Sequence, residues 1–158
     1  MAFNSTRASI DALHPAGGGA SRKFAVTAAI TQPASTVATL FTIVGRIRAI
    51  AIFGEVSTVF ASGTNNTKLI FNPTGTGAST DMCAVVDTAS AAVGTILSIT
   101  GAVADAMTVG AAPYFAIGQA GVQTLSNGVI EVSTSATKTG AAIWTLVYEP
   151  VSTDAVVS

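Results

Sequence analysis

Short runs of Thr, Val and Ile, each ended within about a dozen residues by Gly, Pro, Asn or Ser, fill the chain from Arg22 onward. β-Branched residues favour the extended backbone, whereas Gly, Pro and Asn favour turns. The runs predict strands at 23–31, 36–44, 46–53, 56–60, 68–71, 82–88, 94–99, 106–109, 128–135 and 141–149. We therefore expect an all-β fold, either an antiparallel sandwich or a jelly-roll-like barrel.

Two local signals qualify this prediction. The alanine-rich pieces 89–93 and 102–107 favour helix, because Ala is the best helix former, but nearby glycines leave room for one or two short helices at most. The sequence Lys138-Thr139-Gly140 separates two β-like runs and predicts a hairpin turn.

The first residues differ from the rest of the chain. Three glycines, Gly17 to Gly19, follow His14 and Pro15, and such a run confers flexibility. A chain of 158 residues fits one domain. We expect a flexible N-terminal arm over residues 1–20 and a β-domain over residues 21–158.

Charge is scarce for a soluble chain. Charged residues make up 9% of the sequence and hydrophobic residues 49%, and the formal net charge is -1. This balance gives no electrostatic basis for binding nucleic acid or an anionic membrane. The least charged stretch, 88–104, is too short and too rich in Ser, Thr and Gly to span a bilayer. The surface is either neutral and rich in hydroxyl groups, or covered by copies of the chain or by other subunits, and we favour the covered surface.

No constellation for catalysis or metal binding stands out. The single histidine, His14, lies in the expected arm, and Asp81, Asp87 and Asp105 lack the spacing of a metal loop or of paired catalytic acids. We expect no enzyme activity and no cofactor. Cys83 is the only cysteine, so no internal disulfide forms. The N-terminus has no basic region followed by an apolar one, which favours synthesis in a cytoplasm.

Four basic residues form a candidate patch. Arg46 and Arg48 are two apart on one predicted strand, and Arg22 and Lys23 begin another. Such a patch either meets an acidic neighbour or solvates an exposed face.

Two interpretations fit the aromatic residues. Trp144 and Tyr148 are four apart and point to one side of a strand. Since a core with few aromatics needs them inside, we expect these two residues to be buried; the alternative is a stacking platform for a sugar or a partner. The same expectation of burial holds for Phe24, Phe41, Phe53, Phe60 and Phe71.

Three parts of the chain resemble small virion proteins of tailed bacteriophages. They are 39–54 with the following turn segment 67–80, then 82–101, and the C-terminal part 128–151, GVIEVSTSATKTGAAIWTLVYEPV. The resemblance is one of pattern and transfers no individual functional residue. It implies a β-rich, often trimeric capsid decoration (cement) protein, or a tail or spike component.

From this resemblance and the composition we expect a structural protein on the capsid surface of a virion, made in the host cytoplasm. Its partners would be the major capsid protein and further copies of itself in a homotrimer. The candidate partner-contact residues are Phe3, Arg7, His14, Arg46 and Arg48. The alternatives are a tail, baseplate or spike component, and a carbohydrate-binding module that uses Trp144 or Tyr148.

Overall fold

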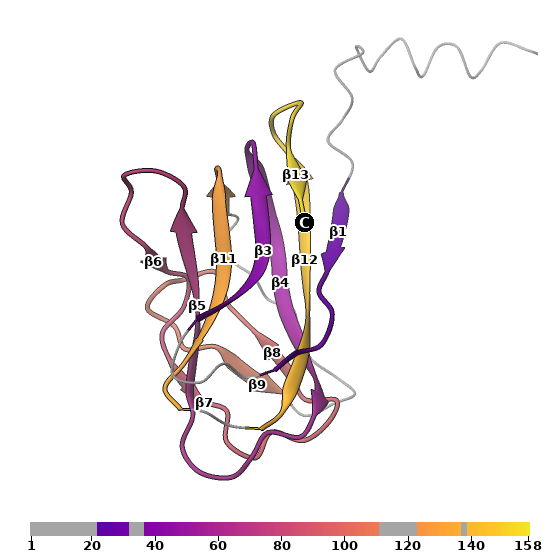
Figure 1. Ribbon diagram of the computed structural model, residues 1–158, viewed down its shortest axis with the longest axis vertical. Helices are drawn as coiled ribbons and strands as arrows, with labels where there is room; N and C mark the ends of the chain where they lie inside the picture. The colour runs from indigo at the N-terminus through magenta and orange to yellow at the C-terminus, as the bar shows by residue number, and fades with distance from the viewer. Residues whose placement is uncertain (1–21, 32–36, 111–122, 137–138) are drawn as a thin grey trace, which may run out of the picture.

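The chain forms two antiparallel β-sheets that pack face to face. The computed structural model describes residues 22–31, 37–110, 123–136 and 139–158, and within these ranges it contains no helix. The all-β prediction is confirmed, and the architecture is a sandwich (Figure 1). The expected arm, residues 1–20, lies outside the described residues.

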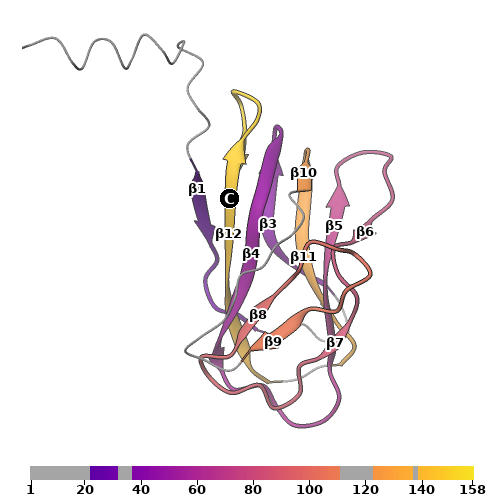
Figure 2. The same cartoon turned by 180° about the vertical axis from the view of Figure 1, so that it is seen from behind.

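Sheet A is built around one long central strand pair. Its main order is β1 (Lys23–Val26), β12 (Ala141–Pro150), β4 (Ile47–Thr58), β8 (Ile96–Ser98) and β9 (Thr108–Gly110). The short strand β2 (Ile30–Thr31) pairs with β12, and β10 (Gln123–Leu125) pairs with β4. Strands β8, β9 and β10 are seen most clearly from behind (Figure 2).

Sheet B supplies the second layer. Its order is β13 (Val156–Val157), β3 (Val37–Val44), β11 (Gly128–Thr134), β5 (Asn66–Pro73) and β6 (Thr80–Asp81), and β7 (Val86–Asp87) also pairs with β5. The buried side chains of the two sheets meet in one core. Its fully buried members include Ile47, Ile52, Val56, Leu97 and Leu146 from sheet A and Phe41, Ile43, Leu69 and Ile130 from sheet B.

The longest strand departs from the sequence-based prediction. Gly54 was expected to separate two strands, but β4 runs without interruption from Ile47 to Thr58. Gly54 pairs with Trp144 of β12, and the space that a Cβ would fill is taken by the indole. The glycine therefore accommodates a neighbour instead of ending the strand.

A β-bulge changes which residues of β4 face the core. Ala51 pairs with Val147 and Ala49 with Tyr148, so Ile50 has no partner residue on β12. Because the extra residue shifts the alternation, Ile47 and Ile52 both point inward although they are five apart in sequence.

The predicted hairpin at Lys138-Thr139-Gly140 is wrong. Strand β11 pairs with β3 and β5 in sheet B, whereas β12 pairs with β1, β2 and β4 in sheet A. The connection therefore crosses between the two sheets, as is common in sandwiches.

Candidate interaction surface

The outer face of sheet A is arranged in four rows of side chains. Alternate residues of β12 are buried at Trp144, Leu146 and Tyr148, so the residues between them point away from the core. The registers with β1 and β4 extend each of these positions across the sheet. Row 1 holds Arg22, Glu149 and Arg48; row 2 holds Phe24, Val147 and Ala51; row 3 holds Val26, Thr145 and Phe53; row 4 holds Ile143 and Glu55.

The two middle rows are apolar apart from Thr145, and they are most open to solvent on the edge strand β1, whereas Ala51 of β4 is buried. Phe24 is 69% exposed and Val26 62% exposed, and Ile143 in row 4 is 37% exposed. Val147 and Phe53 are half-buried beside them. Large apolar side chains from three neighbouring strands thus form one continuous surface.

The outer face of sheet B has a different chemistry. There Lys68 and Asp81 form an ion pair with Nζ–Oδ distances of 2.7 and 2.8 Å, which links β5 to β6. Glu131 of β11 pairs in register with Thr39 on one side and with Ile70 on the other. The exposed large apolar side chains of sheet B are valines, of which Val44 and Val156 pair in register and are 52% and 56% exposed. Among the described residues, the outer face of sheet A carries the larger apolar set, with Phe24, Phe53 and Ile143 beside Val26 and Val147, which marks it as the candidate interaction surface.

Phe24 corrects a prediction. It was expected in the core, but β1 is an edge strand whose register places Phe24 opposite the outward-pointing Val147. Phe53 likewise lies on the outer face, in register with Thr145, and is half-buried. Phe41 and Phe60 are buried as expected, and Phe71 is half-buried against the core.

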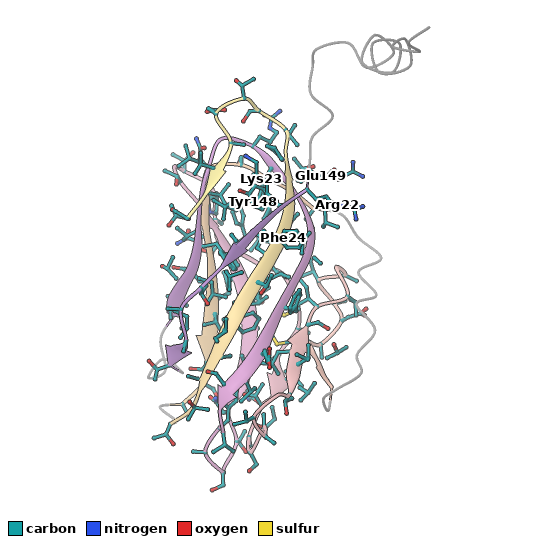
Figure 3. All side chains as sticks on the ribbon, turned by 90° about the vertical axis from the view of Figure 1, so that its right-hand side faces the viewer. Arg22, Lys23, Phe24, Tyr148 and Glu149 are labelled. Carbon is teal, nitrogen blue, oxygen red and sulfur yellow. The ribbon has the colours of Figure 1, made fainter. Side chains whose placement is uncertain are left out.

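Row 1 is an ion-paired cluster. Glu149 accepts from Arg22 Nε at 3.4 Å through Oε1 and from Arg48 Nη1 at 3.5 Å through Oε2. Figure 3 shows Arg22 and Glu149 projecting side by side from the ends of β1 and β12. Two cations share one carboxylate, so this end of the face keeps an excess positive charge, whereas Glu55 gives the far end a negative charge.

The predicted basic patch is only partly assembled. Arg22 and Arg48 meet at Glu149, an acidic neighbour within the same chain. Lys23 pairs in register with the inward-pointing Tyr148, so it is directed away from the outer face. Arg46 lies in the turn before β4, where its N–H donates to Ser152 Oγ at 2.8 Å. Phe3, Arg7 and His14 lie outside the described residues.

Comparison of the chain with protein-family models, with curated proteins and with solved structures finds no match. The proposal for the function of this chain therefore rests on the chemistry of its surface.

The hypothesis that Trp144 and Tyr148 form an aromatic platform is wrong. Trp144 is 2% exposed and Tyr148 5% exposed, and both belong to the core between the sheets. A sugar ring cannot stack on either side chain, so the carbohydrate-binding alternative loses its proposed contact residues.

Two open clefts flank the turn 126–127. One, of about 340 Å³, is lined by residues that include Phe71, Asp81 and Gln123. The other, of about 360 Å³, includes Arg46, Asn127, Ser152 and Asp154; the Ser152 hydroxyl donates to Asp154 and lowers the pKa of that carboxyl. Each cleft holds a single carboxylate, whereas glycoside hydrolysis uses two.

The described ranges hold neither a cluster of metal-ligating side chains nor a membrane-spanning helix. Among those residues, no three His, Cys, Asp or Glu side chains gather in a way that could hold a metal ion. In the same part of the chain, no helix has the length and apolar character needed to cross a membrane.

Proposed function

We propose that this chain is a structural protein of a bacteriophage virion that binds and stabilises the capsid shell as a decoration protein. The observation that carries the proposal is the outer face of sheet A, where Phe24, Val26 and Ile143 are exposed together. Exposed large apolar side chains that lie together commonly mark interaction sites. A chain with 9% charged residues has few other means of keeping such a face apart from its neighbours.

The proposal assigns each part of the chain a mechanical role. The sandwich is a stiff body, because its core is closed by paired strands from both sheets. The residue 1–20 arm, with Phe3, Arg7 and His14, would contact the major capsid protein. Copies of the chain, in the homotrimer that the resemblance implies, would cover one another on the capsid surface after synthesis in the host cytoplasm. Many weak contacts then act together, so no single contact needs high affinity.

Copy number on purified particles tests this role. Quantitative mass spectrometry against the major capsid protein should find on the order of hundreds of copies per virion, as avid coverage of a lattice requires. A few to a few tens of copies would move the chain to the tail, baseplate or a spike. Absence from particles would overturn the virion proposal.

Deletion of residues 1–20 tests the arm separately. We expect the truncated protein to unfold at the same urea concentration as the full chain and to lose binding to particles. As a matched control, the full chain with Glu131→Gln, a change on the outer face of sheet B, should bind normally. Undiminished binding by the truncated protein would show that the arm is not the contact.

A further inference from the structure

We propose that the outer face of sheet A is covered by the same face of a second copy of the chain. The two copies are related by a two-fold axis that lies in the plane between the two facing copies of sheet A and runs perpendicular to their strands. This inference rests on the proposed structural function and names a partner for its exposed surface. It follows from the order of charge and apolar side chains along the strands.

The four rows have a polarity from end to end. Row 1 carries Arg22 and Arg48 with one shared carboxylate, and row 4 carries Glu55. Between them lie the two uncharged rows that contain Phe24 and Val26. The net charge therefore runs from positive in row 1, through two uncharged rows, to negative in row 4.

A two-fold axis perpendicular to the strands reverses this order in the second copy. Each strand then lies antiparallel over its own copy, so row 1 faces row 4 and row 2 faces row 3. Arg48 of each copy approaches Glu55 of the other, and this pair occurs twice. Phe24 of each copy meets the row of Phe53 and Val26. Opposite charges therefore face each other across the contact, and apolar side chains face apolar side chains.

The alternative two-fold axis, parallel to the strands, gives a poor match. It places row 1 of one copy over row 1 of the other, so that Arg22 faces Arg48 and the two Glu149 carboxylates approach each other. Like charges brought together at an interface oppose binding. The distribution of charge therefore selects the perpendicular axis.

The size of the face predicts a reversible contact. Strands are about 4.8 Å apart and successive outward side chains about 6.8 Å apart, so three strands and four rows cover roughly 400 Å² per copy. Stable complexes bury about 800 Å² per partner. We expect association only at high concentration, or where copies are already held close together on a shell.

Pairing through this face is compatible with a homotrimer. A three-fold contact joins two different surfaces of neighbouring copies, whereas a two-fold contact joins a surface to itself. Face-to-face pairing doubles the mass of whatever unit exists without it, whether a single copy or a trimer.

Charge reversal with rescue tests the contact. Sedimentation equilibrium of the full chain, from roughly 10 µM to 1 mM to cover weak association, should give a mass that rises two-fold. Arg48→Glu alone and Glu55→Arg alone should each abolish the rise, and the double variant should restore it. The double variant does not restore the contact of residue 48 with Glu149 in its own chain, so rescue reports the contact between copies.

Two further variants control for folding and for total charge. Glu131→Arg makes the same charge change as Glu55→Arg on the outer face of sheet B and should leave the two-fold rise intact. Phe24→Glu, at an exposed position, should abolish the rise while keeping the circular dichroism of the folded chain. These measurements use no particles, so their outcome is independent of the copy number that tests the virion role.

Three results would overturn the inference. One is a two-fold rise that persists in Arg48→Glu, and another is a double variant that fails to recover it. The third is a wild-type chain whose mass stays constant over the whole concentration range, which would mean that a different protein covers the face.

Discussion

Gly54 of β4 lies directly opposite Trp144 of β12, and a Cβ on the glycine would stand 2.9 Å from Cδ2 and Cε3 of the indole. The largest side chain in the core is thus seated on the one position of the facing strand that has none. This contact lies on the core side of sheet A and packs β12 against β4.

Gly54→Ala should destabilise the protein. The added methyl group overlaps a ring that is 2% exposed and has no free space to enter, and overpacking of this kind costs about 1–3 kcal/mol. Urea unfolding measures the change. In a Trp144→Phe background the smaller ring should reduce the cost of the alanine, and an equal cost in both backgrounds would contradict a steric cause.

Fluorescence of the single tryptophan should report a buried indole. Because Trp144 is enclosed between the sheets, we expect its emission to be blue-shifted relative to the urea-unfolded chain and several-fold less sensitive to acrylamide. Free indole in solution is the reference for full access. Quenching of the native protein at the rate of the unfolded chain would contradict the buried position.

Glu149→Gln should have a small effect on folding. The two arginines that it contacts are 66% and 53% exposed, and exposed ion pairs contribute about 0–1 kcal/mol. Urea unfolding in dilute protein should show a loss within this range that disappears in about 1 M salt, where charges are screened. A loss of several kcal/mol would mean that row 1 holds sheet A together.

The stability of the fold should depend on Cys83 at alkaline pH. Burial raises the pKa of this thiol, a tendency that the Leu69 N–H, donating to Sγ at 3.4 Å, partly opposes. The unfolded chain therefore loses the thiol proton at a lower pH than the folded chain. The stabilisation is fully present below the ordinary thiol pKa and is lost as pH rises above it.

Urea unfolding of wild type and Cys83→Ala at pH 8 and pH 10 measures this dependence. The difference in unfolding free energy between the two proteins should become smaller at pH 10. Other groups titrate in the same range in both proteins and cancel in the difference. A constant difference would contradict a raised pKa.

A buried hydroxyl pair ties β5 to the loop after β7. The Oγ1 atoms of Thr67 and Thr88 are 2.8 Å apart, and both lie within 3.3 Å of the carbonyl oxygen of Asn65. Thr67→Val and Thr88→Val should each cost about 1 kcal/mol, measured by urea unfolding. Because the two hydroxyl groups form one network, the double variant should lose less than the sum, and strict additivity would argue against the shared bond.

Much of the fold is predictable from local chemistry. Strands β3, β11 and β12 coincide closely with the runs of Thr, Val and Ile, since β-branched side chains favour the pleated backbone wherever they recur. The short strands β6, β10 and β13 were missed. They have two, three and two residues and are held by pairing to β5, β4 and β3, contacts that no local pattern encodes.

The interaction surface was harder to predict because it depends on register. Arg48 was singled out as a contact residue, but nothing in the sequence reveals that Glu149 would lie beside it. Phe24 looks like any core aromatic until its strand is placed at the edge of sheet A. Glu55 could not be assigned to this face from the sequence, because the predicted strand ended before Gly54. In the structure β4 continues past Gly54 and places Glu55 at the far end of the same face.

Strand β1 also determines how the sandwich responds to a pull on the residues before it. All four of its residues are in register with β12, from Lys23 opposite Tyr148 to Val26 opposite Thr145. Tension along the strand loads these pairs together, in shear, whereas a force that lifts Lys23 away from the sheet opens them one after another. A sandwich tethered through the residues before β1 would therefore resist a force along the strand more strongly than a force that pulls β1 away from the sheet.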